Sequence, residues 1–227
     1  LTSAPMQPQA DPFIVPVCDD DITLIHQDDS FLLINKPTGL LSLSGKHPLN
    51  KDSVHYRLVQ DYPTATLVHR LDFGTSGIML VALNKSANAN FTRQFQTRTV
   101  KKTYRAILYG EMVNDSGVIA FPIAKDKANF PQQKICYEEG KPAETRYRVL
   151  ERMSENCTKV DFTPVSGRTH QLRIHSREIG HPILGCDIYA TDAAFAMANR
   201  LMLHATQLEF HHPVTGALLQ GICPFPF

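Results

Sequence analysis

Short apolar runs separated by polar turns dominate the chain from residue 22 onward. The segment ITLIHQDDSFLLINKP (22–37) has two apolar runs around a Gln-Asp-Asp-Ser turn, which predicts a β-hairpin that stops at Lys36-Pro37. The run GIMLVAL (77–83) is continuous and apolar, which is typical of a buried central strand. The remaining predicted strands lie over 102–110, over 157–165, in two parts around a Glu-Gly-Lys turn over 134–153, and in two parts around a Pro-Val-Thr-Gly turn over 201–222.

Four segments have the spacing or the end signals of helices. Their predicted ranges are 51–62, with an N-cap at Asp52 or Ser53, Ser86 to about Thr97, about Thr169 to Gly180, and 191–200. Because strands dominate and short turns join most of them, the pattern predicts an α+β fold with a mixed, mostly antiparallel central β-sheet and flanking helices. Residues 1–20 are expected to form an N-terminal arm or flexible lead-in, and residues 21–227 a single domain.

The composition is that of a globular protein, since 43% of the 227 residues are hydrophobic and 20% are charged. No apolar run approaches the roughly 20 residues that span a bilayer, and the first residues lack the basic and apolar regions of a signal peptide. The five cysteines are Cys18, Cys136, Cys157, Cys186 and Cys223. Their wide spacing disfavours a zinc site and a disulfide framework, so we expect a cytoplasmic protein with reduced thiols and no contact with a membrane.

The net charge of +1 hides an uneven distribution along the chain. Residues 1–30 contain six acidic groups and no Lys or Arg, whereas residues 73–110 contain six basic groups and no acid. A basic stretch of this kind attracts phosphates, although it is also typical of an ordinary solvated face. The charge pattern is therefore only a hint of a polyanionic partner.

Motifs of several common enzyme classes are absent or incomplete. GLLSLSGKH (39–47) resembles a P-loop, but five residues separate its glycines and His47 replaces the Ser or Thr that holds magnesium, which disfavours nucleotide hydrolysis. A GxSxG motif is missing, which disfavours a serine hydrolase. The ten histidines form no HExxH motif or other ligand set, so no metal ion is expected.

One segment combines a polar loop with the start of a buried strand. In VHRLDFGTSGIML (68–80), Asp72 precedes Gly74 and Gly77, small residues that allow tight turns and the close approach of a ligand. A carboxylate in such a place can act as a nucleophile or a base, but it is more often a cap or a turn former. Spacing alone favours the turn-forming role.

The segment HRLDFGTSG (69–77) contains every fixed position of the HRLDxxTSG signature, and it resembles the RluA-type pseudouridine synthase family. Five further blocks resemble that family in the same order: NKPTGLLS (35–42), VKKTYRAILYG (100–110), GKPAETRY (140–147), VSGRTHQLRIH (165–175) and GHPILG (180–185). The resemblance covers the chain from about residue 22 to its end, and it is greatest to the short member without an S4-like domain that modifies both ribosomal RNA and tRNA. The chain departs from the family at Cys186, where an acidic residue is usual, and Asp187 follows one place later.

The resemblance implies an isomerase that converts uridine in RNA to pseudouridine without a cofactor or a metal ion, with residues 21–227 as the catalytic domain. Its implied partner is a structured RNA stem-loop, in large-subunit ribosomal RNA, in the tRNA anticodon arm or in both. No obligate protein partner is implied, and a monomer is the default expectation. By the same resemblance Asp72 is the essential carboxylate, which attacks C1′ of the ribose, attacks C6 of the uracil or assists elimination towards a glycal; the sequence leaves these routes open.

The resemblance also assigns roles to residues around Asp72. Arg173 matches an arginine that pairs with the catalytic carboxylate, Tyr104 an aromatic residue beside the target uracil, and Arg70 an arginine that occupies the space of the extruded uridine. Without the resemblance, Arg173 would be an exposed helix residue and Tyr104 a strand packing residue. The further residues expected to bind RNA are His69, Leu71 and Thr75 of the signature and, as phosphate contacts, Lys101, Lys102, Arg168, Arg93 and Arg98.

Two other functions compete with this one. A non-catalytic RNA-binding protein that retains the fold would have lost Asp72 or its arginine partner, and both are present. A nucleoside or glycoside hydrolase would carry a second carboxylate near Asp72, and none is evident in the sequence.

Overall fold

The computed structural model describes residues 14–227, and one sheet of ten strands runs through them. The strands are β1 (Thr23–Gln27), β2 (Phe31–Lys36), β3 (Thr66–Leu67), β4 (Ser76–Ala82), β5 (Lys101–Tyr109), β6 (Ser116–Ile119), β7 (Ile123–Lys125), β8 (Gln133–Ile135), β9 (Thr145–Met153), β10 (Cys157–Pro164), β11 (Leu203–His211) and β12 (Leu218–Ile222). The helices are α1 (Val54–Asp61), α2 (Lys85–Gln96), α3 (Gln171–Glu178) and α4 (Asp192–Ala196), with a short 3-10 helix over Pro48–Asn50. The strands β7 and β8 form a separate pair.

The strand order of the large sheet is β1-β2-β4-β11-β5-β10-β9-β6, with β12 added to β11 and β3 added to β4. All of its pairs are antiparallel except β4 with β11, which meet through Ser76 and Gly77. Gly77 has a φ of +116°, and a Cβ atom there would lie 2.2 Å from the backbone oxygen of Ala205. Only glycine fits this close approach, which explains the last residue of the TSG motif. The predicted α+β fold with a mostly antiparallel sheet is confirmed.

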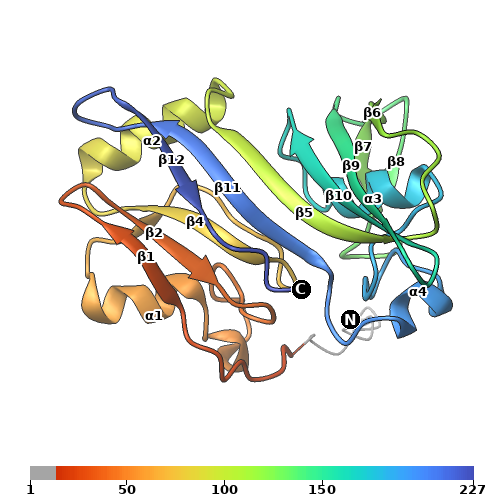
Figure 1. Cartoon of the computed structure of the whole chain (residues 1–227). Coiled ribbons are helices and arrows are strands. Elements are labelled where there is room, and N and C mark those ends of the chain that lie inside the picture. Colours follow the sequence, from red (N-terminus) through yellow and green to blue (C-terminus); the bar gives the residue numbers. More distant parts are fainter. Residues whose placement is uncertain (1–13) are drawn as a thin grey trace, which may run out of the picture.

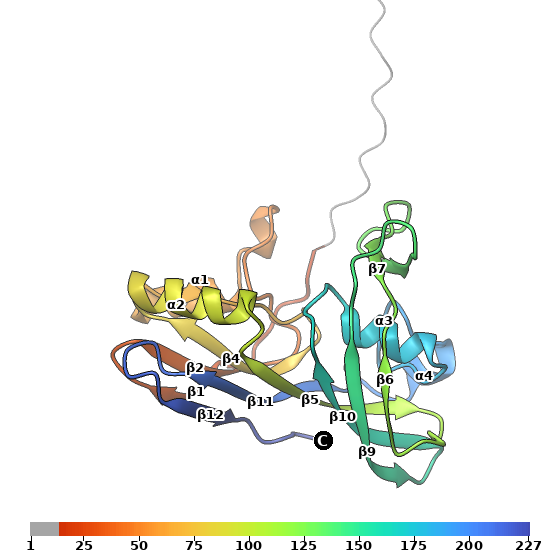
Figure 2. The ribbon, with the colours of Figure 1, turned by 90° about the horizontal axis from the view of Figure 1, so that it is seen from above.

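The helices cover one face of the sheet in two groups. Figure 2 shows α1 and α2 over the half that contains β1, β2 and β4, and α3 and α4 over the half that contains β9 and β10. The long strands β5 and β11 join the two halves (Figure 1). Each half has its own core, represented by Phe31 and Phe91 in one and by Phe162 and Ile174 in the other, and Tyr104 packs against both.

Most predicted elements are present, with two local corrections. The hairpin over 22–37 is β1 with β2, and Ser53 caps α1 by accepting a hydrogen bond from the backbone of Tyr56. Helix α2 begins one residue before Ser86, because the Asn84 side chain is its N-cap. The two strands predicted around the Glu-Gly-Lys turn do not pair with each other: β8 pairs with β7, and β9 pairs with β6 and β10.

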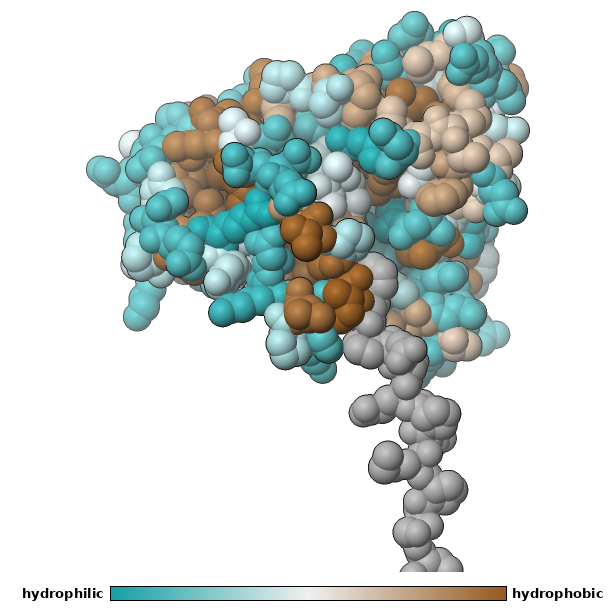
Figure 3. Space-filling model, turned by 90° about the horizontal axis from the view of Figure 1, so that it is seen from below, coloured by the Kyte–Doolittle hydropathy of each residue, from teal (hydrophilic) through white to brown (hydrophobic). Residues whose placement is uncertain are grey.

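The predicted N-terminal arm over 1–20 lies mostly outside the described residues. Residues 14–22 contain no helix or strand, but Arg57 donates hydrogen bonds to the backbone oxygens of Cys18 and Asp20 and so ties this segment to α1. Seen from below, the surface is largely hydrophilic, with apolar side chains gathered near its centre (Figure 3). Within residues 14–227, no helix is long and apolar enough to cross a bilayer.

Candidate active site

A cleft of about 710 Å³ lies where the two halves of the sheet meet. Its walls come from the loop before β4, the strand β5 and the start of α3. Ten of the predicted site residues line it: His69, Arg70, Leu71, Asp72, Thr75, Arg98, Lys102, Tyr104, Arg168 and Arg173. Lys101 and Arg93 do not. The structure therefore brings together residues that are separated by about one hundred positions in the chain.

Asp72 and Arg173 form an ion pair across this cleft. Asp72 lies in a tight turn closed by a 3.1 Å hydrogen bond from the Thr75 backbone N–H to the Asp72 backbone oxygen. Its Oδ2 is 3.7 Å from Nη1 of Arg173, and the Arg173 side chain is only 7% exposed. Arg173 is therefore not the exposed helix residue that its position in the sequence alone would suggest. A buried guanidinium needs a carboxylate nearby, because an isolated buried charge is strongly destabilising.

Residues 36–42 hold the loop that carries Asp72. Ser42 Oγ donates to the Leu71 backbone oxygen at 2.7 Å and accepts from the Leu71 backbone N–H at 3.1 Å. Thr38 Oγ1 donates to the Gly74 backbone oxygen at 2.7 Å. These positions belong to the NKPTGLLS block, which in the sequence alone indicates only the resemblance to the family. The signal was therefore present, but its role as the support of the Asp72 loop needed the three-dimensional contacts.

Lys36 is the deepest of these supporting residues and was not among the predicted site residues. It is fully buried, and its Nζ donates to the backbone oxygens of Pro37 at 2.9 Å and Phe73 at 3.2 Å. Burial lowers its pKa to about 7, although Cys18 and Asp72 act in the opposite direction. Lys36 thus fixes the residue that follows Asp72 from beneath the loop.

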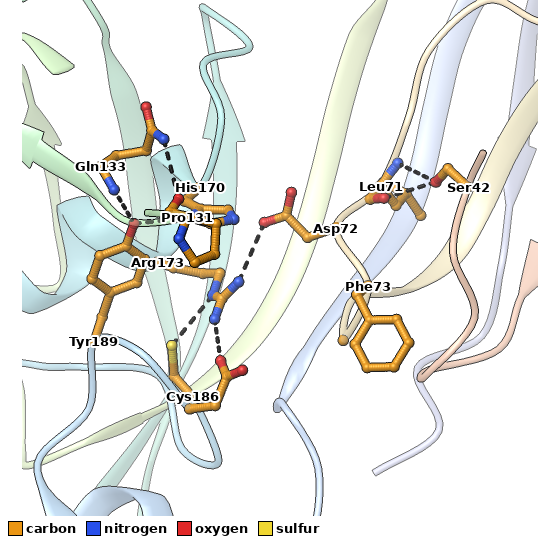
Figure 4. A network of polar contacts seen from close by, with 12 residues as sticks. Ser42, Leu71, Asp72, Phe73, Pro131, Gln133, His170, Arg173, Cys186 and Tyr189 are labelled. Atoms are coloured by element: carbon orange, nitrogen blue, oxygen red, sulfur yellow. Dashed lines mark hydrogen bonds and ion pairs between the residues drawn. The ribbon is translucent and has the colours of Figure 1, made fainter. Parts of the chain in front are cut away.

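Three further contacts surround the Arg173 guanidinium (Figure 4). Its Nη2 donates to Asp187 Oδ1, its Nε donates to Cys186 Sγ at 3.3 Å, and its Cζ lies 5.4 Å from the centre of the Tyr189 ring. Burial disfavours the charged guanidinium, but Cys186, Asp72 and Asp187 together outweigh this effect and raise the pKa of Arg173.

Tyr104 and Lys102 reach the cleft because side chains alternate along a strand. Their neighbours point the other way: Lys101 pairs with Glu209 at 2.6 Å and Arg105 with Asp161 at 2.8 Å. Burial, and then the Asp72 carboxylate, raise the pKa of Tyr104. Its phenol is therefore protonated over the neutral range and available as a hydrogen-bond donor.

The two histidines of the cleft are held by the fold. His69 stacks on Phe95 with ring centres 4.8 Å apart, and its Nε2 accepts a 2.9 Å hydrogen bond from the Leu80 backbone. Burial, with the nearby Lys102, lowers the pKa of His69 to about 3. His170 Nδ1 lies 2.8 Å from the Tyr189 hydroxyl, and burial lowers its pKa although the Asp72 carboxylate acts in the opposite direction. Both rings are neutral near pH 7.

Four basic side chains of the cleft form no ion pair with a carboxylate among residues 14–227: Arg70, Arg98, Lys102 and Arg168. Arg70 and Arg98 are exposed, and burial lowers the pKa of Lys102, with Arg98 adding to the effect. Positive charges without partners around a cleft attract a polyanion, since phosphates then neutralise them. No group of three or more potential metal ligands occurs in the described part of the chain.

The fold and this cleft define an enzyme of the nucleic-acid-modifying class, with a carboxylate paired to a buried arginine beneath a basic rim. A family model described as RNA pseudouridylate synthase matches residues 30–178, and the chain belongs to this family.

Individual relatives agree with this assignment. The chain is 48% identical over 204 residues to a Yersinia pestis protein named dual-specificity RNA pseudouridine synthase RluA, with 90% of this chain and 99% of the relative covered. It is 45% identical to the protein of the same name from Escherichia coli K12, with 91% and 94% covered. Among solved structures, human RNA pseudouridylate synthase domain containing 1 is similar, with a TM-score of 0.78, 30% identity, and 93% and 86% of the two chains covered.

These comparisons confirm the RluA-type resemblance and the prediction of an isomerase that makes pseudouridine in RNA. They favour it over the alternative of a non-catalytic RNA-binding protein.

Proposed function

We propose that this chain isomerises uridines in folded stem-loops of both large-subunit ribosomal RNA and tRNA, with Asp72 as the essential carboxylate. The observation that carries the proposal is the pair of Asp72 and Arg173 in a cleft whose other basic side chains pair with no carboxylate among residues 14–227. The relatives named dual-specificity enzymes, at 45–48% identity over most of the chain, support two kinds of RNA substrate. All proposed groups lie within residues 21–227, which supports one catalytic domain, and a monomer remains our expectation.

The reaction moves the uracil on its ribose without a change in oxidation state. The N1–C1′ bond breaks, the base turns, and a C5–C1′ bond forms, while the proton of C5 is lost and N1 gains one. Asp72 attacks C1′, attacks C6 or assists formation of a glycal, and Arg173 holds its carboxylate in place. The protonated phenol of Tyr104 stacks on the base or donates to it, and Arg70, exposed at the rim, fills the space that the extruded uridine leaves.

Replacing the carboxylate tests this assignment. Asp72→Asn removes the negative charge with little change in shape, so we expect RNA binding to persist and pseudouridine formation to be abolished. RNA labelled with tritium at C5 of uridine reports the reaction through release of tritium to water, and filter binding reports affinity. Tritium release at the wild-type rate by the Asn variant would remove Asp72 from the chemistry.

The substrates are tested separately, by mapping pseudouridine in RNA from a strain that lacks the gene. We expect loss of at least one site in large-subunit ribosomal RNA and one in the tRNA anticodon stem-loop, with both restored by the wild-type gene. Loss in only one of these RNAs would reduce the proposal to a single specificity. The same strain complemented with Asp72→Asn should remain without both modifications.

A further inference from the structure

Arg173 also borders a second cleft, which we call the rear cleft. This cleft has a volume of about 500 Å³ and shares Arg173 and Phe73 with the cleft that contains Asp72. Asp187 lines only the rear cleft, and its side chain is 67% exposed. The Arg173 guanidinium therefore lies between two carboxylates, Asp72 on the substrate side and Asp187 on the rear side.

The contacts of Arg173 with Asp187 and with Asp72 differ in length, and this difference assigns the two carboxylates different roles. Nη2 of Arg173 lies 2.5 Å from Asp187 Oδ1, whereas Nη1 lies 3.7 Å from Asp72 Oδ2, beyond hydrogen-bond distance. Because the guanidinium is planar and its N–H groups have fixed directions, the tight contact at Nη2 determines where Nη1 points. The third contact, from Nε to Cys186 Sγ, is to a weak acceptor and contributes less to the orientation.

We propose that Asp187 is a positioning residue, which holds the Arg173 guanidinium from the rear cleft so that Nη1 faces Asp72. This inference rests on the proposed function of Asp72. The Asp187 side chain is exposed, and Asp72 remains as an ion-pair partner of the buried Arg173 when the charge at position 187 is removed, so the fold should tolerate the change.

The test compares variants by the steady-state kinetics of tritium release. Asp187→Asn should lower kcat about tenfold through misalignment of Arg173, with KM and RNA affinity unchanged because Asp187 does not line the substrate cleft. Asp187→Glu should retain most of kcat, since it keeps a carboxylate. Asp19→Asn is the matched control: Asp19 is an exposed acid of the same rear cleft without an ion pair to Arg173, and its loss should leave kcat unchanged.

A rescue variant makes the test more specific. In Cys186→Asp/Asp187→Asn the carboxylate returns to the position whose sulfur lies 3.3 Å from Arg173 Nε, and we expect it to recover most of the lost kcat. Thermal unfolding establishes that each variant is folded. If the buried aspartate prevents folding of the double variant, the comparison of Asp187→Glu with Asp187→Asn decides instead.

A second readout separates this inference from the proposed function. In the arginine region of a ¹⁵N NMR spectrum, the Nε–H signal of Arg173, assigned with Arg173→Lys, should shift in Asp187→Asn and stay in place in Asp19→Asn. A wild-type chain without tritium release would overturn the function while this signal still reports on Asp187. Wild-type kcat in Asp187→Asn, an equal loss in Asp19→Asn, or a folded double variant without recovery would overturn the positioning role.

Discussion

His69 belongs to the signature around Asp72, yet its side chain supports the fold. Its Nε2 accepts the Leu80 backbone hydrogen bond and its ring stacks on Phe95, so the neutral form is the one that fits. The protonated ring would lose this acceptor and would lie beside Lys102 in a poorly solvated place. The presence of a residue in a motif therefore does not show whether its side chain contacts the substrate or supports the fold.

The pH dependence of stability tests this role. The pKa of His69 is about 3 in the folded chain and ordinarily 6.5, so between these values the unfolded chain binds a proton that the folded chain does not. This contribution to stability is complete above the ordinary pKa and is lost as the pH falls below it. Urea unfolding should show that wild type loses about 2 kcal/mol more than His69→Gln between about pH 7.5 and pH 5. Equal losses in the two proteins would contradict a neutral His69.

Among single residues, the sequence predicted the side chains that meet in the cleft better than the residues that support them. Asp72, Tyr104 and Arg173 were identified through ordered motif blocks, and all three line one cleft. Lys36 was missed because its hydrogen bond to the Phe73 backbone joins positions 37 residues apart. Every residue has a backbone oxygen, so the residue type at position 73 does not indicate this contact.

At the scale of elements, the backbone is strained at Arg98, just after the end of helix α2, and the side chain of this residue lines the cleft. Arg98 has a φ of +59° and follows the C-cap Thr97, a position where glycine is the usual residue. Its backbone N–H donates to the Phe95 oxygen, which closes the helix, and its side chain lines the cleft. A left-handed conformation costs a residue with a Cβ atom about 1 kcal/mol.

Substitution of Arg98 should separate stability from binding. Arg98→Gly relieves the backbone strain and should raise the free energy of unfolding by up to about 1 kcal/mol while it weakens RNA binding. Arg98→Ala, the control, removes the same guanidinium but keeps the Cβ atom, so it should weaken binding without the gain in stability. Chemical unfolding and filter binding measure the two effects, and wild-type affinity in both variants would exclude Arg98 from the RNA contact.

The segment before helix α1 supports the loop that carries Asp72 through Ser42. Ser42→Ala removes two hydrogen bonds to the Leu71 backbone in a buried place, which should cost about 1–3 kcal/mol of stability and lower kcat. Ser44→Ala is the control, because Ser44 donates to the Lys51 oxygen at an exposed site away from the loop. Loss of stability without loss of kcat in Ser42→Ala would show that the loop keeps its geometry without this serine.

The elements that the sequence predicted are those with an apolar pattern of their own. Strands β2 and β4 bury nearly continuous apolar runs, so their existence and type were clear, and β1, although exposed, was recognised as the partner of β2 through the turn between them. The pairing of β8 with β7 was missed because β7 has only three residues, Ile123–Lys125, and its partner is selected by backbone hydrogen bonds. Short polar strands of this kind have too little pattern to be recognised.

At the scale of the whole molecule, the distribution of charge matters more than its sum. The chain has a net charge of only +1, but the alternation of side chains along β5 places Lys102 in the cleft and Lys101 outside it, paired with Glu209. The sequence predicted a basic stretch correctly. It did not divide the stretch between the two faces of the strand, because neighbouring strands determine which face borders the cleft.

The salt dependence of RNA binding measures this division. Lys102→Ala should weaken binding and reduce the slope of log affinity against log salt concentration by about one, as expected for one lost phosphate contact. Lys101→Ala should change the slope much less, because its ammonium already pairs with Glu209. Equal reductions of the slope in both variants would show that the RNA extends beyond the cleft to the opposite face of β5.

The position of β11 in the sheet makes the cleft depend on a late part of the chain. This strand lies between β4 and β5, although residues 203–211 follow both of them by more than ninety positions. Without β11, the pairing order leaves β4, which follows the loop with Asp72, and β5, which carries Tyr104, on two groups of strands that share no pairing. A chain that stops before residue 203 would contain Asp72 and Tyr104 but would lack the cleft that both residues line. Assembly of the cleft therefore requires one of the last strands of the sheet to be synthesised.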